Sequence, residues 1–196
     1  YLTIGGHPDI PRTLAASGQL STAAGEGQGV QSTGGNLRLD AGTGLVNEGV
    51  ISADQGSLAV RAGSQLSNGG TLNAGQSVDI ADGAGGASQV VDNRGSIIAG
   101  QVLNTQAAAV RNSGWMQAGS ANNLAAGTLD NSGKLIAVTG SAALRVDGLL
   151  RNSGSVRAAQ GKITPLHALC DELDLRPVNK RVLESLVKAG AFDAFA

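Results

Sequence analysis

The chain has 196 residues, a formal net charge of −1, 2% aromatic residues and 15% charged residues. A net charge near zero argues against nucleic acid or an anionic membrane as a partner, because both attract an excess of positive charge. No run of about 20 apolar residues is present, as a membrane-spanning helix would need. Thirty glycines would suit a disordered linker, but disorder goes with few hydrophobic residues, and 41% of this chain is hydrophobic. We therefore expect a folded core built from many thin layers.

From residue 12 to about residue 160 the sequence repeats with a period of about 20 residues. Each repeat has Asn-x-Gly, then a short apolar segment and an alanine, as in N-E-G-V-I-S-A at 47–53. A degenerate copy, A-S-G-Q-L-S-T-A, stands at 16–23. The repeated asparagines are 21, 25, 19, 19 and 21 residues apart: Asn47, Asn68, Asn93, Asn112, Asn131 and Asn152.

Each period also contains two further short apolar segments. One alternates apolar and polar residues, as in Leu37-Arg38-Leu39, and the other leads into the asparagine, as in Leu45-Val46. Alternation with a period of two is typical of a strand with one buried face. Three strands and three turns in about 20 residues describe one coil of a parallel β-helix. We therefore predict an all-β fold, a right-handed parallel β-helix (a solenoid) over residues 1–161. One inward column is expected to contain Leu20, Ile51, Leu72, Ile97, Leu135 and Val156.

The Asn-x-Gly units are expected at corners of the coils. Asn and Gly tolerate the left-handed backbone conformation that a tight corner would require. Equivalent asparagines would then stack, and their side-chain amides could form a ladder from coil to coil. No proline stands between Pro11 and Pro165, which agrees with a backbone whose N–H groups nearly all enter a sheet. We interpret the six asparagines as structural corner residues.

The pattern L-x-N-x-G-x-I-x-A, followed by a strand such as S-L-x-V, resembles the repeats of filamentous haemagglutinins and related large adhesins of two-partner secretion. The resemblance covers about residues 12–160. It implies a fragment of a secreted or cell-surface adhesin stalk that crosses the outer membrane through a partner transporter. It also implies contacts with host-cell surfaces or neighbouring adhesin rods, and no enzyme activity. The secretion domain of that family is not found in this sequence, and the first residue is Tyr1, so we expect a piece of a longer protein.

The composition changes near residue 161. Residues 163–196 contain one glycine and nine charged residues in 34. Leu166, Leu169, Cys170 and Leu173 fall on one stripe of an amphipathic helix, and Pro177 suits the first turn of a second helix. We predict a short α-helical tail over residues 162–196, with Cys170 as a small core residue and not a nucleophile.

This tail resembles a second family. Residues 169–193, L-C-D-E-L-D-L-R-P-V-N-K-R-V-L-E-S-L-V-K-A-G-A-F-D, are similar to the latter half of the helix-hairpin-helix region in the α subunit of bacterial DNA polymerase III. The glycine hairpin and the metal-binding carboxylates of that family are not found upstream. A join of two unrelated reading frames, a genuine fusion and a coincidental similarity each fit this junction. The alternative function is therefore a fragment of a DNA polymerase III α subunit, which acts in DNA replication.

No group of side chains predicts catalysis, a cofactor or a metal ion. His7 and His167 have no cysteine or carboxylate at the spacing of a metal site. Residues 25–29, G-E-G-Q-G, lack the order of a phosphate loop, and we expect a widened turn there. Residues 82–86, D-G-A-G-G, form a single copy without the spacing of a calcium-binding repeat, and an inserted loop would also explain the 25-residue interval.

Two kinds of exposed residue remain as candidates for contacts. Trp115 replaces a small residue in its repeat, either as an outward contact residue or as a local packing variant. Four arginines are spread along the repeats and are expected on a solvated face, with a weak glycan or heparin contact as the alternative: Arg94, Arg111, Arg151 and Arg157.

Overall fold

The computed structural model describes residues 2–4, 12–25, 28–83 and 89–160. Their regular structure is entirely β, with 20 strands, and contains no helix. Nothing among these residues is both helical and apolar enough to span a membrane. The helices predicted over 162–196, with His167 and Cys170, lie outside the described residues, as does His7.

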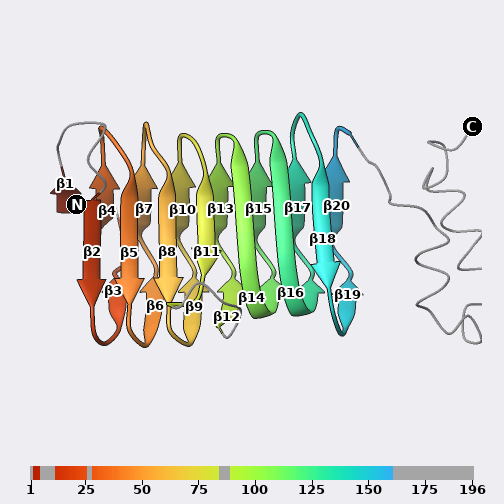
Figure 1. Cartoon of the computed structure of the whole chain (residues 1–196), viewed down its shortest axis with the longest axis horizontal. Helices are drawn as coiled ribbons and strands as arrows, with labels where there is room; N and C mark the ends of the chain where they lie inside the picture. Colours follow the sequence, from red (N-terminus) through yellow and green to blue (C-terminus); the bar gives the residue numbers. More distant parts are fainter. Residues whose placement is uncertain (1, 5–11, 26–27, 84–88, 161–196) are drawn as a thin grey trace, which may run out of the picture. The chain divides into compact units, whose positions relative to one another are not determined.

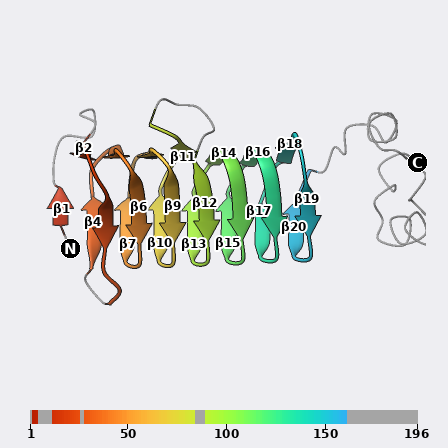
Figure 2. The same cartoon turned by 90° about the horizontal axis from the view of Figure 1, so that it is seen from below.

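The strands form three faces that follow one another along each coil (Figures 1 and 2). The first face contains β2 (Arg12–Ala16), β5 (Leu37–Ala41), β8 (Leu58–Ala62), β11 (Val78–Ala81), the beginnings of β14 (Val102–Asn112) and β16 (Ala121–Asn131), and β18 (Ala142–Val146). The second contains β3 (Leu20–Thr22), β6 (Gly44–Asn47), β9 (Gln65–Asn68), β12 (Val90–Asn93), the ends of β14 and β16, and β19 (Leu150–Asn152). The third contains β1 (Leu2–Ile4), β4 (Gly29–Ser32), β7 (Val50–Ala53), β10 (Thr71–Ala74), β13 (Ser96–Ala99), β15 (Trp115–Ala118), β17 (Lys134–Ala137) and β20 (Ser155–Ala158).

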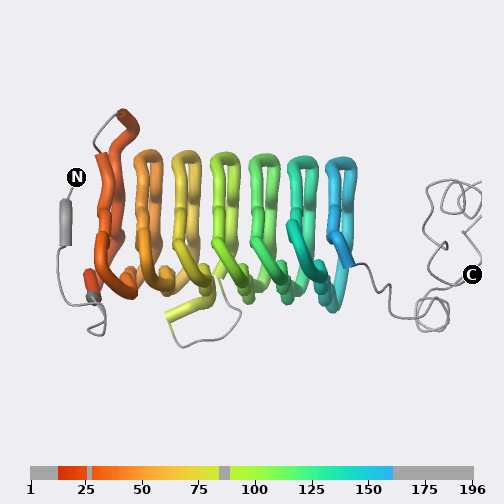
Figure 3. The backbone as a smooth tube through the Cα atoms, turned by 90° about the horizontal axis from the view of Figure 1, so that it is seen from above, coloured from red at the N-terminus to blue at the C-terminus, as the bar shows by residue number. Residues whose placement is uncertain are grey.

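The strands pair in parallel, and each residue pairs with its equivalent one coil away. Leu72, for example, lies between Ile51 and Ile97. In Figure 1 the nearer strands run downward, the farther strands run upward and the coils advance to the right, which is a right-handed turn. Figure 3 shows that the coils are evenly stacked. The solenoid has about seven turns. The predicted parallel β-helix is confirmed.

The core consists of thin layers, one for each coil. On the third face Ile51, Leu72, Ile97, Met116 and Leu135 form a buried inward column. Leu45, Leu66, Val91, Val110 and Leu129 form the corresponding column of the second face. Because every layer covers the one before it, small aliphatic residues suffice to exclude water.

The prediction for Leu20 is wrong. Leu20 pairs with Leu45 on the second face, and Val30 occupies the place next to Ile51 on the third face. The Ser-Gly of residues 17–18 imitates an Asn-x-Gly unit, but Thr22 is the residue in register with Asn47. Val156 does pair with Leu135, as predicted.

The coils differ in how they pass from the first face to the second. In β14 and β16 the strand continues through this corner for 11 residues. In the preceding coil, β11 and β12 both pair with β14 and are separated by residues 82–89. The long interval between Asn68 and Asn93 therefore comes from an insertion at a corner that the next two coils cross in one continuous strand.

Candidate functional site

The six repeated asparagines lie at the ends of second-face strands, where the chain turns toward the third face. The structure joins them in one ladder, in which Nδ2 of each asparagine donates to Oδ1 of the next. The five N···O distances are 2.7 Å from Asn47 to Asn68, 2.8 Å from Asn68 to Asn93, and 2.7 Å from Asn93 to Asn112, Asn112 to Asn131 and Asn131 to Asn152. At the N-terminal end, the hydroxyl of Thr22 donates to Oδ1 of Asn47.

The first four ladder amides also hold the adjoining strand of the next coil. Nδ2 of Asn47 donates to the main-chain oxygen of Thr71 at 3.1 Å, and Nδ2 of Asn112 donates to that of Lys134 at 3.2 Å. The main-chain oxygen of Asn47 accepts hydrogen bonds from the N–H groups of Gly69 and Gly70 at 2.8 and 3.0 Å. The buried amides are therefore hydrogen-bonded, as burial of a polar group requires.

The left-handed corners predicted for the asparagines are absent. Within the described ranges no residue other than glycine has a positive φ, and the glycines that do are Gly25 and Gly29. The glycine of each Asn-x-Gly unit is required for a different reason. A Cβ on Gly114 would lie 2.1 Å from the oxygen of Gly95, and one on Gly133 would lie 2.1 Å from the oxygen of Gly114. The close approach of successive coils, and not the sign of φ, excludes a side chain there.

A shallow groove of about 560 Å³ runs along the outside of the same corner. We call it the corner groove and define it by its lining residues: Arg94, Gly95, Ser96, Ser113, Gly114, Trp115, Ser132, Gly133, Lys134, Gly154 and Ser155. Eight of these eleven residues are glycine or serine. Its larger side chains are one aromatic ring and two cations.

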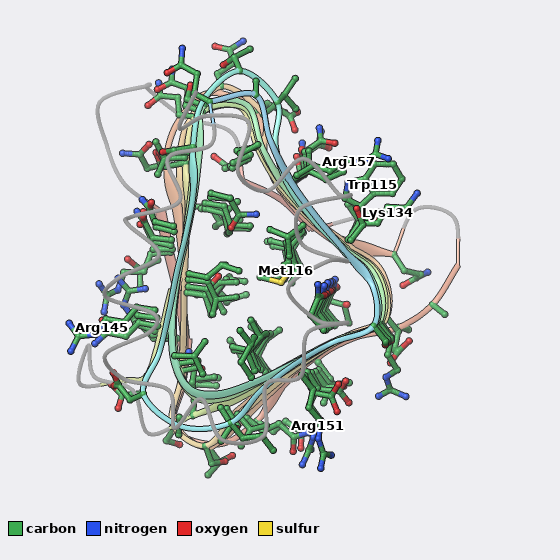
Figure 4. All side chains as sticks on the ribbon, turned by 90° about the vertical axis from the view of Figure 1, so that its right-hand side faces the viewer. Trp115, Met116, Lys134, Arg145, Arg151 and Arg157 are labelled. Atoms are coloured by element: carbon green, nitrogen blue, oxygen red, sulfur yellow. The ribbon has the colours of Figure 1, made fainter. Side chains whose placement is uncertain are left out.

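Trp115 points outward beside the corner groove, while its neighbour Met116 points into the core (Figure 4). The indole is 39% exposed. The Nζ of Lys134 lies 4.5 Å from the ring centroid, and Nε1 of Trp115 donates to Oε1 of Gln117 at 3.2 Å. Trp115 is therefore an outward residue and not a packing variant of the core.

The four arginines do not form one line. Arg94 lines the corner groove, where its Nη2 donates to Oγ of Ser67 at 3.2 Å and lies 3.5 Å from a carboxylate oxygen of Asp92. Arg157 lies on the third face, in the strand next to that of Lys134, and Arg151 lies on the second face (Figure 4). On the second face, opposite charges alternate in register: Asp92, Arg111, Asp130 and Arg151. Such alternation favours stacking of coils over binding of an anion.

Three buried polar side chains were not predicted. In the described part of the chain, neither the amide of Gln89, nor the hydroxyl of Thr105, nor Oδ1 of Asn122 has a hydrogen-bond partner. Thr105 lies in register between Ile80 and Leu124, at a position that neighbouring coils fill with an aliphatic residue. These side chains mark the layers of the core that depart from the repeat.

Among the described residues, no three His, Cys, Asp and Glu side chains lie close enough to hold a metal ion. The surface pair of Arg38 and Asp40 has an N···O distance of 2.8 Å, and its hydrogen bond and opposite charge raise the pKa of Arg38. A guanidinium with a raised pKa stays charged, so Arg38 is not suited to proton transfer.

The described fold is that of a β-solenoid repeat protein. Among known proteins, a family model described as a helix-hairpin-helix motif matches residues 153–196. The DNA polymerase III subunit alpha of Pseudomonas aeruginosa is 35% identical over 66 residues, which are 34% of this chain and 6% of that protein. No solved structure matches the chain.

Both matches agree with the resemblance of the C-terminal region to DNA polymerase III. The family match begins inside the solenoid, because residues 153–160 include β20. It covers less than half of the chain, and the chain spans only a small part of the polymerase subunit. The family match therefore concerns the C-terminal region, and neither match places the whole chain in a family.

Proposed function

We propose that this chain is a segment of the repetitive stalk of a secreted bacterial adhesin, with a structural and adhesive role and without catalysis. The observation that supports the proposal most is the stack of about seven equivalent coils, held by one continuous asparagine ladder. A solenoid of this kind grows by adding coils that contact only their neighbours. At about 4.8 Å for each coil, its length is proportional to the number of repeats. Such a rod can hold a binding surface away from a cell.

In this proposal the chain leaves the cell through an outer-membrane transporter and folds outside. Nearest-neighbour stacking supports this route, since each coil can add to the preceding one as the chain emerges. The outward faces of the rod then meet host-cell surfaces or neighbouring rods. No single side chain carries the function; the corner asparagines and glycines determine the shape.

Labelling of source cells with antibodies against residues 12–160 tests the proposal. We expect intact cells, and the medium around them, to carry the label. An antibody against a cytosolic protein, which should label only permeabilised cells, is the control. Label that appears only after permeabilisation would contradict an adhesin.

The helix-hairpin-helix match at 153–196 favours a second candidate, a fragment of a DNA polymerase III α subunit. Fluorescence anisotropy with a labelled DNA duplex separates the two candidates. The polymerase candidate predicts binding that weakens steeply with salt and is lost when residues 161–196 are deleted. The adhesin candidate predicts no DNA binding by either form of the chain.

A further inference from the structure

We propose that part of the second face of the solenoid binds a second copy of this chain, packed face to face with the two rods antiparallel. This part is the outward side of β12, of the ends of β14 and β16, and of β19. We call it the docking face. The inference rests on the proposed adhesin function, because it names a neighbouring rod as a partner of the stalk.

The docking face has two outward columns of side chains, one charged and one uncharged. Side chains alternate along a strand, so the residues on either side of the buried aliphatic column of the second face point outward. The residues that follow the buried column are in register and alternate in charge: Asp92, Arg111, Asp130 and Arg151. The residues that precede it are small or apolar: Val90, Ala109, Thr128 and Leu149. A strip of alternating charges therefore runs beside an uncharged strip.

Most charges of this column have no partner within the chain. Asp92 forms an ion pair with Arg94, at an N···O distance of 3.5 Å. No ion pair joins Arg111, Asp130 or Arg151 to another described residue, although side chains of opposite sign lie one coil apart. All three side chains are exposed, and Arg151 extends away from the rod in Figure 4. These charges are therefore available to a partner.

The order of the charges is complementary to itself when one copy is reversed. A twofold axis that runs parallel to the strands, between the coils of β14 and β16, reverses the rod and keeps the direction of the strands. Arg111 then faces Asp130 of the second copy, and Asp92 faces Arg151 of the second copy. Because the axis repeats both contacts, every charge of the column meets its opposite.

The uncharged column matches itself about the same axis. Ala109 faces Thr128 of the second copy, and Val90 faces Leu149 of the second copy. Leu149 is 54% exposed in the single chain, so this contact would remove apolar surface from water. Packed sheets lie about 10 Å apart, and the small residues beside the axis permit that approach. With the rods parallel about a twofold axis, each charge would instead face its own copy and be repelled.

A second copy fits this face better than a polyanion or a polycation. The charged column has as many acidic as basic side chains, so it has no net charge that would attract either one. The whole chain has a net charge of −1, so two copies repel each other little. The coils that pair span only about 20 Å, which is short for a stable interface. We therefore expect weak association of single chains.

Sedimentation velocity of the full chain, at concentrations up to about 1 mM, measures this association. We expect the sedimentation coefficient to rise with concentration toward that of a dimer, and to rise less when salt screens the charges. Arg111→Asp should weaken the association about tenfold, because it places two carboxylates opposite each other on both sides of the axis. Arg145→Asp makes the same change of charge on the first face, in β18 (Figure 4). This control should associate like the wild type.

Mixing two variants separates pairing between copies from effects within one rod. Asp130→Arg alone should associate as weakly as Arg111→Asp, since each variant brings like charges together beside the axis. An equimolar mixture of the two should associate about as tightly as the wild type, because every charge then faces its opposite in the other variant. Mixing cannot repair a loss of coil stacking within one chain. Circular dichroism of each variant verifies the fold.

Several results would overturn the inference. They are a sedimentation coefficient that stays constant up to about 1 mM, an association that Arg111→Asp leaves unaltered, or a mixture that associates no better than its two components. The second result would assign the association to another part of the chain. None of them alters the cell-surface labelling, so failure of the docking-face proposal is distinguishable from failure of the adhesin proposal.

Discussion

The interior coils and the last coil share one sequence pattern but differ in burial. Leu129 is 1% exposed, whereas its register neighbour Leu150, one coil later, is 51% exposed. Leu135 is fully buried, and its neighbour Val156 is 37% exposed. Among the described residues the last coil has a neighbour on one side only. Burial in this fold therefore depends on the neighbouring coil more than on the residue itself.

The largest expected difference in stability is between two leucine truncations, one in an interior coil and one in the last coil. Leu66→Ala should cost about 2–5 kcal/mol of unfolding free energy, because it leaves a cavity between two covering layers. Leu150→Ala, in the same column of the last coil, should cost less than about 1 kcal/mol, since half of its side chain is already exposed. Urea unfolding of both variants gives the difference. Equal losses would mean that the last coil is covered as fully as the interior.

Substitutions in the asparagine ladder should also cost more unfolding free energy in an interior coil than in the last coil, with smaller losses than for the leucines. Asn131→Leu removes a donor and an acceptor, which leaves the amide of Asn112 without its side-chain acceptor and Asn152 without its donor. The cost should be about 1–3 kcal/mol. Asn152→Leu removes only an acceptor for Asn131 and should cost clearly less. The same urea experiment measures both, and an unchanged stability of Asn131→Leu would contradict a supporting ladder.

Much of this architecture could be predicted from the sequence, because the repeat encodes it. The period of apolar residues placed Ile51, Leu72 and Ile97 in one inward column. The register of the first coil could not be obtained in this way, because Ser17-Gly18 imitates the repeat unit while Thr22 occupies the asparagine position.

The glycines of the Asn-x-Gly units were predicted at the corners for the wrong reason, a left-handed backbone. A glycine can be required by φ or by a close contact, and the pattern N-x-G does not distinguish these causes. Only the stacked coils show that the oxygen of Gly95 fills the space beside Gly114. The corner groove was missed, although the repeats already align Ser96, Trp115 and Lys134 at one position. That alignment was the signal that could have placed the indole between a serine and a lysine.

Not every interior layer of the core is filled by aliphatic side chains. At Thr105 we expect a substitution to raise the stability and not to lower it. Thr105→Val replaces a buried hydroxyl without a described partner by a methyl group between Ile80 and Leu124. We expect stability to rise by about 1 kcal/mol, seen as a higher melting temperature. Thr22→Val is a useful contrast, because that hydroxyl is hydrogen-bonded and its loss should destabilise the first coil. A loss of stability in Thr105→Val would show that the hydroxyl has a partner.

The smallest effect is expected from removal of residues 163–196. If this tail is foreign to the repeat, its deletion should change the stability of the coils by less than about 0.5 kcal/mol and should not promote aggregation. Light scattering and urea unfolding of the shortened chain measure both. Unfolding of the last two coils around Leu135 and Val156 would instead identify the tail as a working cap of the exposed strand edge.

Native-state hydrogen exchange of the full chain tests the dependence of burial on neighbouring coils most directly. Exchange reports the free energy of opening for each strand. We expect the slowest exchange in β10, β13 and β15, which lie between other coils on both sides. Exchange should then become faster toward β20, as nearest-neighbour stacking requires. Protection that is uniform from β4 to β20, or that is greatest in the last coil, would contradict the account.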